Sequence, residues 1–320
     1  MEKRLATIGI MSIGDMGMGI AKLLKANSYH VVTVASNRSQ ATRTRIQEAE
    51  VENLSSDEQI YCHSDYIFSI APPRDARSIA ERVLKASKST NVNRNGQLYY
   101  VDFNAISPQS TLELSRLFES NPQISFLDGG IIGGPPTLIG PTEWKKPSLV
   151  VSGPRIFQDN TAPSGSNLAE TLNIRHINDS IGSASGLKMC FASIIKGLTA
   201  LATESFTTAS RLGVLDQLRT HLKEFNPKIG ELAERGLVGM PPKAYRWVRE
   251  MEEIGDTMAE QGGFSSDLFK AIAEVYRIVA EDTELGKEQT GARVRGKTPE
   301  DAALLISDGL SKKKVEEKKG

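Results

Sequence analysis

The 320-residue sequence predicts an N-terminal α/β domain built on a doubly wound, mostly parallel sheet, followed by an all-α C-terminal domain, with a long interdomain helix joining the two. Three observations predict this fold. Short apolar runs typical of buried strands alternate with helical patterns up to about residue 180. A glycine-containing turn separates the first apolar run from the first helical pattern. From Gly182 onward the sequence shows only helical periodicity.

The interdomain helix is predicted over Gly182–Gly213, a stretch without proline whose first half is almost free of charge. Its apolar residues fall on more than one face of a helical wheel, so we expect it to be buried on nearly all sides. Gly213 stands where a C-cap glycine belongs. We therefore place the α/β domain at residues 1–180, the helical domain at residues 181–311 and a disordered charged tail at residues 312–320.

The composition narrows the classes of partner. The formal net charge is zero, which provides no basic surface for nucleic acid and no charge bias toward a membrane. The two cysteines, Cys62 and Cys190, are too few for a disulfide framework and fit a reducing, cytoplasmic compartment. The four histidines are scattered, so we expect no protein-built metal site. A small-molecule ligand is the expected partner, with no nucleic acid and no membrane.

The first strand, predicted at Leu5–Met11, is followed at once by the turn Ser12-Ile13-Gly14-Asp15-Met16-Gly17 and then by a helix. Strand, glycine turn and helix are the context of a dinucleotide fingerprint, in which the helix N-terminus faces the phosphates. Gly14 would let the backbone approach a pyrophosphate, and Gly17 would let the helix pack on the strand. Ser12 replaces the usual first glycine. The alternative is an ordinary tight turn.

The second strand, predicted at His30–Ala35, ends in a turn that contains Asn37, Arg38 and Ser39. Folds that bind NAD carry an acidic residue here to hold the ribose 2′-hydroxyl, and this chain has none. The fork of Arg38 is suited to a 2′-phosphate, and its neighbours add neutral donors. The turn therefore favours NADP over NAD, the alternative being a solvated turn.

Three more predicted strands end in polar or glycine-rich segments. We expect these segments to lie at the same edge of the sheet, outside the carboxyl ends of the strands, where such sheets bind ligands. Tyr66–Ala71 stops at Pro72-Pro73, Leu98–Asp102 leads into Asn104, and Ile124–Asp128 leads into a loop predicted at residues 129–136. Ser107 followed by Pro108 has the pattern of a helix N-cap. The last strands are expected at Ser148–Ser152 and Ile174–Ile177, with a polar loop at residues 157–167. The candidate cofactor residues at these ends are Ala71, Pro72, Pro73 and Asn104.

The helical half is predicted to hold helices at residues 215–224, 227–237, 242–261, 266–280 and 299–311. Lys188 is the anomaly near the start of the interdomain helix, because a lysine on an apolar helix either extends to water or serves a site. Lys196 is able to pair with a carboxylate, although it is more commonly a helix lysine without a special role. The basic-aromatic set at residues 243–249 is able to hold an acidic substrate, although such a set is more commonly a solvated face, and the acidic run at residues 250–253 reads as surface charge.

These motifs together resemble those of the β-hydroxyacid dehydrogenases, relatives of 6-phosphogluconate dehydrogenase, and in particular the branch whose helical C-terminal domain is of uncharacterised function. The resemblance extends to about residue 285. The family's signatures appear here as Ser12-x-Gly14-x-x-Gly17, Asn37-Arg38-Ser39, Asp102-x-Asn104-x-x-Ser107-Pro108, Asp128-x-x-Ile131-Ile132-Gly133-Gly134 and Gly182-x-Ala184-x-x-x-Lys188.

The resemblance implies a Rossmann domain that binds NADP and an oxidoreductase that moves a hydride between the nicotinamide and a CH–OH or C=O substrate. By the same resemblance Lys188 is the catalytic acid/base, Asn104, Gly133 and Gly134 line the substrate, and the chain pairs into a homodimer through its helical domain. The family's serine before the glycine pair is Ile132 here, and its asparagine after the lysine is Ala192. Both positions belong to the predicted substrate site.

These departures imply either a less polar, differently anchored substrate or lost activity. Two alternatives therefore stand beside the dehydrogenase. An imine reductase shares the architecture, but commonly has another residue at the position of Lys188. A catalytically silent NADP-binding protein is favoured by Ile132 and Ala192.

Overall fold

The computed structural model describes residues 5–35, 40–89, 94, 96–158 and 162–317. The chain divides into two compact units, Met1–Met189 and Cys190–Gly320. The long helix α7 (Ser183–Leu212) begins in the first unit and continues into the second.

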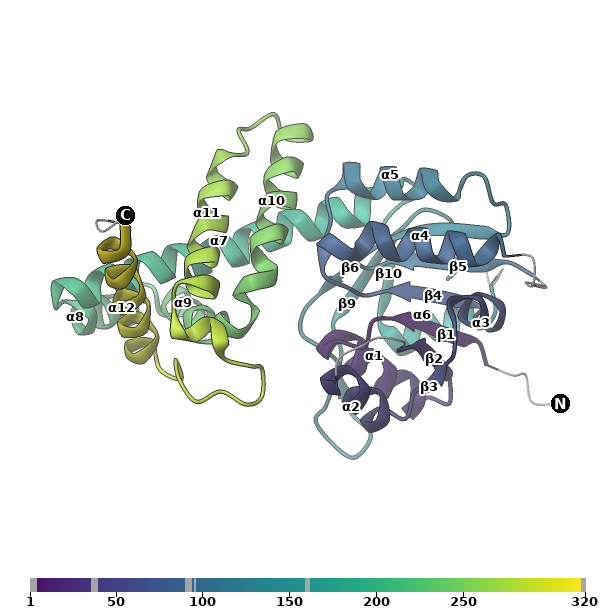
Figure 1. Ribbon diagram of the computed structural model, residues 1–320, viewed down its shortest axis with the longest axis horizontal. Coiled ribbons are helices and arrows are strands. Elements are labelled where there is room, and N and C mark those ends of the chain that lie inside the picture. Colours follow the sequence, from purple (N-terminus) through teal and green to yellow (C-terminus); the bar gives the residue numbers. More distant parts are fainter. Residues whose placement is uncertain (1–4, 36–39, 90–93, 95, 159–161, 318–320) are drawn as a thin grey trace. The chain divides into compact units, whose positions relative to one another are not determined.

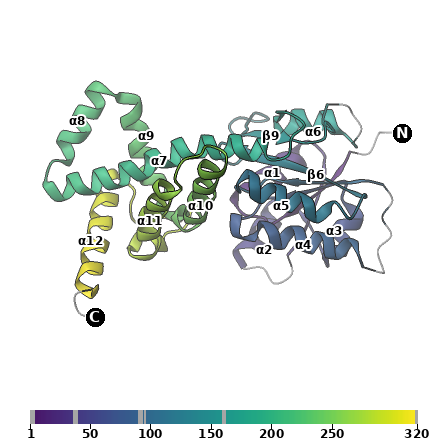
Figure 2. The same cartoon turned by 90° about the horizontal axis from the view of Figure 1, so that it is seen from above.

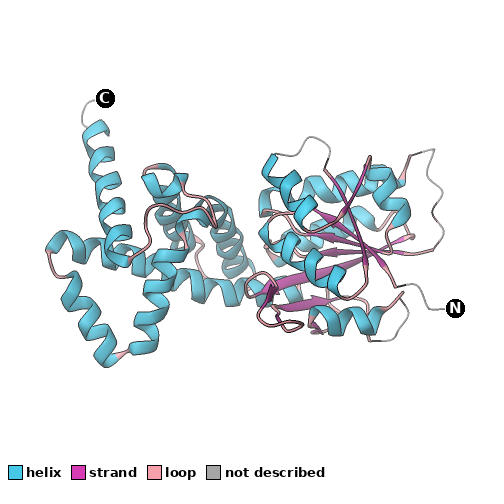
Figure 3. Cartoon of the chain, turned by 90° about the horizontal axis from the view of Figure 1, so that it is seen from below, coloured by secondary structure: helices cyan, strands magenta, loops and turns pink. Residues whose placement is uncertain are grey.

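The first unit contains an eight-stranded sheet in the order β10-β9-β6-β5-β4-β1-β2-β3 within the described residues, which Figure 1 labels and Figure 3 shows in magenta. Every neighbouring pair is parallel except β6 with β9. The predicted doubly wound, mostly parallel sheet is confirmed. The strands are β1 (Thr7–Met11), β2 (His30–Val34), β3 (Glu52–Leu54), β4 (Tyr66–Ser69), β5 (Leu98–Asp102), β6 (Ile124–Ile132), β9 (Ser148–Ser152) and β10 (Ile174–His176), with a separate hairpin of β7 (Thr137–Leu138) and β8 (Trp144–Lys145).

Helices cover both faces of this sheet, because successive strand residues point to opposite sides. Val31 lies in one buried cluster and Val32 in the other. The first cluster receives side chains from α1 (Asp15–Ala26), α2 (Gln40–Glu48) and α6 (Gly165–Leu172). The second receives them from α3 (Asp57–His63), α4 (Ala76–Ser87) and α5 (Pro108–Phe118), and the short helix η1 (Pro73–Asp75) precedes α4.

Two local predictions for this unit need correction. The segment 157–167 is not entirely loop, because α6 begins at Gly165 and buries Leu168 and Leu172 one turn apart. Gly129 and Gly130 do not form a loop either, since β6 continues to Ile132 and pairs antiparallel with β9, and the predicted loop begins only at Gly133. Glycine is needed there for close packing: a Cβ on Gly129 would lie 2.6 Å from the ring of Phe103.

The second unit is helical, as predicted, and Figure 2 shows its helices from above. After α7 come α8 (Leu215–Phe225), α9 (Pro227–Gly239), η2 (Pro241–Lys243), α10 (Ala244–Glu260), α11 (Asp267–Glu281), η3 (Glu284–Lys287) and α12 (Pro299–Glu317). Gly213 ends α7 at φ +71°, so the predicted C-cap is confirmed. Met251, Ile254 and Tyr276 are fully buried in this unit.

The helix α12 also continues past the predicted end at Ser311, so residues 312–317 are helical rather than disordered. Lys313 on this extension lies 2.7 Å from a carboxylate oxygen of Asp282. This ion pair joins the extension to the C-cap of α11, a contact worth about 0–1 kcal/mol at a partly exposed position.

The helix α7 is not buried on nearly all sides, which corrects the prediction from its apolar wheel. In the second unit Phe206 is 1% exposed, whereas Ile194 is 71% and Leu201 59% exposed. Helical periodicity shows that a face is apolar, but it does not show what covers that face. Among the described helices, α7 is also long and apolar enough to cross a membrane by length and composition, a test that core helices of globular proteins pass as well.

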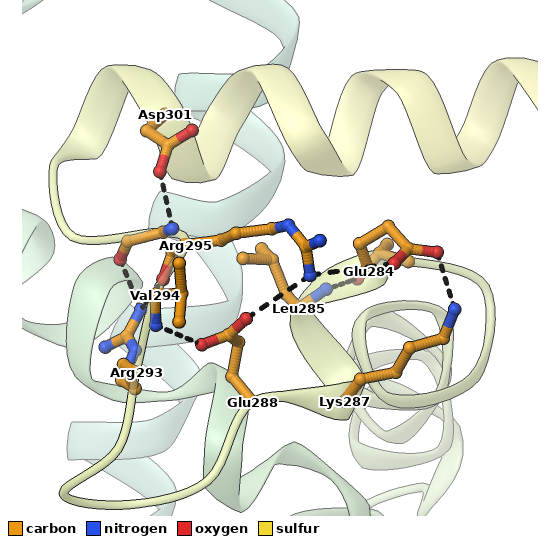
Figure 4. A network of polar contacts seen from close by, with 10 residues as sticks. Glu284, Leu285, Lys287, Glu288, Arg293, Val294, Arg295 and Asp301 are labelled. Atoms are coloured by element: carbon orange, nitrogen blue, oxygen red, sulfur yellow. Dashed lines mark hydrogen bonds and ion pairs between the residues drawn. The ribbon is translucent and has the colours of Figure 1, made fainter.

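The segment between η3 and α12 is held by charged side chains rather than by regular structure (Figure 4). Glu288 accepts a hydrogen bond of 2.6 Å from the backbone of Val294, which lowers the pKa of Glu288. Arg293 donates to the carbonyl oxygens of Val238 and Gly296. Asp301 accepts from the backbone N–H of Gly296 at 2.5 Å. These contacts tie the segment to α9 and to the start of α12.

Candidate active site

The glycine turn between β1 and α1 has the geometry that the fingerprint predicts. Ser12 adopts φ +84°, the left-handed conformation for which glycine is normally used. A Cβ on Gly17 would lie 2.5 Å from the carbonyl oxygen of Ser12, so only glycine allows α1 to pack this closely on β1. The side chain of Ile13 is buried in the core, which leaves its backbone for the turn.

The N-terminus of α1 is open to a ligand. Its N-cap residue, Gly14, makes no side-chain capping hydrogen bond, and a Cβ on Gly14 would meet nothing within 4 Å. The first-turn N–H groups of a helix are the usual site for a phosphate. Asp15 in this turn is an acidic group, but its carboxylate lies 3.4 Å from the guanidinium of Arg45 on α2. That contact offsets the negative charge beside the turn, so an anionic ligand fits the site.

The predicted NADP-selecting residues Asn37, Arg38 and Ser39 lie outside the described residues. They follow β2, which pairs parallel with β1. Their role as ligands of a 2′-phosphate therefore stays a prediction.

Asn104 joins the ends of β4 and β5. Its Oδ1 accepts a 2.6 Å hydrogen bond from the backbone N–H of Ala71, and its Nδ2 donates to Ser69 Oγ at 2.7 Å and to Asp102. The side chain is 2% exposed. Asn104 thus fixes the backbone where the chain enters Pro72-Pro73, and Ser107 caps α5 as predicted. The predicted contacts of Asn104 with the cofactor and the substrate stay a prediction.

Four polar residues form one row across the sheet, a feature that sequence reasoning missed. Ser69, Asp102, Asp128 and Ser152 are paired in register on neighbouring strands, and each is at most 1% exposed. Burial first, and then the charge of Asp128, raises the pKa of Asp102 to about 8. The sequence signal for this row is an acidic residue at the end of two predicted strands, at Asp102 and Asp128.

Asp128 receives only hydrogen-bond donors. Its Oδ2 accepts from Ser152 Oγ, from the backbone N–H groups of Gly182 and Ala184, each at 2.9 Å, and from that of Ser185 at 3.1 Å. Its Oδ1 accepts from Ser185 Oγ at 2.6 Å. Burial raises the pKa of Asp128, and these hydrogen bonds oppose the rise. The carboxylate of β6 therefore joins the sheet to the start of α7.

Lys188 lies one turn beyond these contacts, on the part of α7 that belongs to the first unit. It is partly buried. A Cβ on Gly130 would lie 2.9 Å from Lys188 Cβ, so the base of the lysine side chain packs directly against β6. The strand ends at Ile132, and Gly133 and Gly134 beyond it are exposed, Gly133 at φ +122°. Lys188 thus lies near the edge of the sheet that carries the glycine turn and the strand ends.

Ala192, the remaining predicted substrate residue, is buried at 2% exposure and belongs to the second unit. In that unit Lys196 forms an ion pair with Glu250 and lies 4.6 Å from the centre of the Trp247 ring. Glu250 and Glu253 are 7% and 2% exposed, so the prediction that the acidic run is surface charge is wrong for these two residues. They lie three residues apart and so share the buried face of α10 with Met251 and Ile254, which composition alone does not reveal.

No group of three or more histidine, cysteine, aspartate or glutamate side chains suited to a metal ion occurs among the residues that the structure describes. The cofactor that these residues fit is a dinucleotide, because the open helix N-terminus and the glycine turn offer backbone donors to phosphate.

Comparisons with family models match both halves of the chain. Residues 7–92 match the family described as NADP oxidoreductase coenzyme F420-dependent. Residues 209–279 match a domain of unknown function, DUF1932. An uncharacterised 28.5 kDa protein from Methanothermus fervidus is 24% identical over 253 residues, which cover 77% of this chain and 88% of that protein.

Solved structures share the fold of the whole chain. The 3-hydroxyisobutyrate dehydrogenase of Mycobacterium tuberculosis, solved with L-serine, superposes with a TM-score of 0.64 at 17% identity and covers 95% of this chain and 99% of its own. An imine reductase from Myxococcus stipitatus, in complex with NADP+, superposes with a TM-score of 0.52 at 17% identity and covers 95% and 99%.

These matches confirm the predicted resemblance at the level of domain families and fold. The chain therefore has two segments that match these family models, and it shares its fold with a solved 3-hydroxyisobutyrate dehydrogenase.

Proposed function

We propose that this protein is an NADP-dependent oxidoreductase that acts on a small-molecule CH–OH or C=O substrate, with Lys188 as the acid/base. The observation that carries the proposal is the packing of Lys188 against Gly130, on the strand that carries Asp128. The row of Asp128, Asp102 and Ser69 continues in register to Met11, the residue before the glycine turn. A binding turn for the phosphates and an ionisable amine at the same sheet edge are the two parts that hydride transfer to a carbonyl needs.

The residues of the turn would hold the cofactor. The N–H groups at the start of α1 would bind the pyrophosphate, and the segment from Ala71 to Pro73, fixed by Asn104, would contact a ribose. Arg38 would bind the 2′-phosphate. The bound nicotinamide supplies the hydride chemistry. Lys188 would give a proton to the substrate oxygen during reduction or take it during oxidation, and Gly133 and Gly134 would admit the substrate close to the backbone.

The central experiment compares Lys188→Ala with Lys188→Arg. We expect both variants to bind NADPH with an unchanged dissociation constant, while Lys188→Ala loses about 10²- to 10⁴-fold in kcat, because a positioned proton donor contributes that much. Lys188→Arg keeps the charge but is not able to exchange a proton at neutral pH. It should therefore be nearly as inactive. Unchanged turnover in either variant contradicts the role of Lys188.

Cofactor choice is tested at Arg38. Replacing it by alanine should raise the dissociation constant of NADPH by about 10- to 100-fold, since a charge-assisted fork to phosphate is lost, and should leave that of NADH within about twofold. Equal losses for both cofactors would show that Arg38 does not recognise the 2′-phosphate.

The substrate class and the alternatives are separated by a panel of 3-hydroxyacids, their oxo forms and cyclic imines, assayed with NADP+ or NADPH. Turnover of hydroxyacids that depends on Lys188 supports the dehydrogenase. Turnover of imines alone supports an imine reductase. NADPH binding without turnover of any compound supports the silent alternative that Ile132 and Ala192 favour.

We propose in addition that the chain forms a homodimer through α7. Phe191, Ile194 and Leu201 lie along one side of this helix and are 42%, 71% and 59% exposed. Covering such side chains is worth about 1.5–3 kcal/mol each. Ile194→Glu should therefore convert the dimer to a monomer in light-scattering measurements, whereas Leu268→Glu, at an equally exposed position on α11, should not. A monomeric wild type, or binding of the wild type to lipid vesicles, would contradict a dimer.

A further inference from the structure

The carboxylate of Asp128 accepts hydrogen bonds from the backbone at the start of α7. It is 0% exposed and lies at the last position where β6 pairs with β5. Three of its five hydrogen bonds come from backbone N–H groups at residues 182–185, directly at the start of the helix. These N–H groups have no partner within a helix, so they need an acceptor from elsewhere. Asp128 acts as a helix cap supplied by a distant strand.

The hydroxyl groups around Asp128 make this cap specific. Ser152 Oγ donates to Asp128 Oδ2 and accepts from the N–H of Ala184 at 3.1 Å. Ser185 Oγ donates to Asp128 Oδ1 and lies 2.8 Å from Thr111 Oγ1 on α5. Because every partner of Asp128 is a donor, the arrangement favours the ionised carboxylate, and its charge is also stabilised by the helix dipole.

The strand β6 makes a second contact with α7, a close packing at Gly130. A Cβ there would lie 2.9 Å from Lys188 Cβ and 3.2 Å from the carbonyl oxygen of Ala184. Lys188 comes three residues after Ser185, so its place is set by the cap before it and by the contact with Gly130 beside it. A shift of the first turn of α7 would therefore move the amine relative to the sheet edge.

We propose that Asp128 is the positioning residue of the site: it fixes the start of α7 on β6 and thereby aims Lys188 at the edge of the sheet. This inference rests on the proposed role of Lys188 as acid/base. Asp128 is not itself the proton-transfer group, because it is fully buried and hydrogen-bonded only to donors of the protein's own fold. It acts through the position of the lysine.

The informative variant is Asp128→Asn. An asparagine oriented with its oxygen at the Oδ2 position keeps the acceptor for the three backbone N–H groups, and its amide donates to Ser185 Oγ, so the fold is retained while the charge and part of the cap are lost. We expect kcat to fall by about 10- to 100-fold, as for a misplaced catalytic group, while the KM for NADPH stays within about twofold. Ser152→Ala removes one donor to Asp128 and the second acceptor of the Ala184 N–H, but leaves the three backbone N–H contacts of Asp128. It is the matched control and should cost less than about threefold.

A second measurement does not depend on turnover. Reductive methylation labels lysines at rates that reflect their exposure and mobility, and mass spectrometry separates Lys188 from Lys22 and Lys25 on α1. In Asp128→Asn we expect Lys188 to be labelled at least about threefold faster, while the two α1 lysines keep their rates. Asp128→Ala should increase the effect, because it leaves the N–H groups without any acceptor.

The outcomes separate this inference from the proposed function. If Lys188→Ala is fully active but Asp128→Asn still changes the labelling of Lys188, the acid/base role fails and the positioning role stands. If Asp128→Asn leaves both kcat and the labelling of Lys188 unchanged, the positioning role is overturned. Loss of NADPH binding and of kcat together in Asp128→Asn also overturns it, because that result marks a general structural role.

Discussion

At the scale of single residues, Asp102 has the property that is easiest to test. Its pKa is raised from 3.8 to about 8 by burial and by the charge of Asp128, so the folded protein holds a proton there that the unfolded chain releases. A raised pKa in the folded state contributes stability that is complete below pH 3.8 and is lost as the pH rises toward 8. Asn104 and Ser69 hydrogen-bond the same side chain.

Asp102→Asn should remove this dependence, because asparagine has the shape of the neutral carboxyl group and does not titrate. Relative to the wild type, the free energy of unfolding of the variant should gain up to about 1.4 kcal/mol per pH unit between roughly pH 5 and pH 7.5. Urea titrations at several pH values measure this difference. A constant difference across that range would mean that Asp102 is ionised in the folded protein.

Ser12 provides a second residue-scale prediction. At φ +84° a side chain costs about 1–2 kcal/mol, whereas glycine adopts this conformation freely but adds about 0.5–1 kcal/mol of unfolded-state entropy. We expect Ser12→Gly to stabilise the protein by about 0.5–1 kcal/mol. Ser12→Ala is the control, since it removes the hydroxyl group and keeps the strain. Stabilisation by alanine but not by glycine in thermal unfolding would assign the effect to the hydroxyl group instead.

At the scale of elements, alanine should have different effects at a glycine of β6 and at a glycine of the first turn. A Cβ on Gly130 would meet Lys188 Cβ at 2.9 Å, whereas a Cβ on Gly14 would meet nothing within 4 Å. Gly130→Ala should therefore destabilise the protein by about 1–3 kcal/mol through overpacking. Gly14→Ala should leave stability within about 0.5 kcal/mol but weaken NADPH binding at least tenfold, because the added methyl group occupies the phosphate approach.

Thermal unfolding and NADPH titration of these two variants measure both effects. Tight NADPH binding by Gly14→Ala would mean that the cofactor does not approach the backbone at this turn. An unchanged melting temperature for Gly130→Ala would mean that α7 and β6 separate without cost, and would weaken the geometric case for Lys188.

The same elements show what sequence reasoning was able to predict. The strand–turn–helix at residues 7–26 and the limits of α7 follow from glycine, apolar and cap signals that lie within a few residues of one another. The sequence predicts too early an end for β6, because its glycines indicate a loop unless their packing partners, such as Phe103, are known. The cap of α7 by Asp128 joins residues more than fifty positions apart, and local patterns contain no trace of it.

At the scale of the whole molecule, the sequence predicted the order of an α/β domain and a helical domain correctly. What it did not predict is which apolar surface the chain covers itself. The wheel of α7 is apolar on several faces, yet Phe206 is buried and Ile194 exposed. Burial depends on contacts between distant helices, such as the 2.5 Å hydrogen bond from the hydroxyl group of Tyr276 on α11 to the carbonyl oxygen of Lys196 on α7.

The division into two compact units predicts how NADPH changes the thermal unfolding of each unit. The sheet domain has its own buried clusters, and the helical unit has a separate set of buried residues that includes Met251 and Ile254. A ligand stabilises the part of a protein that binds it, by about 2.7 kcal/mol at a hundredfold excess over its dissociation constant. NADPH should therefore raise the temperature of the calorimetric transition that belongs to the first unit and leave that of the second unit in place.

Assignment of the two transitions comes from Gly14→Ala for the first unit and from a core change in the second, Ile254→Ala, which should lower only the transition of the helical unit. At the same NADPH concentration the first transition of Gly14→Ala should rise less than that of the wild type, because the variant binds NADPH at least tenfold more weakly. Equal upward shifts of both transitions in the wild type would show that the helical unit is energetically coupled to cofactor binding. Since α7 runs without interruption from the first unit into the second, the turns of the helix that follow Lys188 provide a continuous path for such coupling.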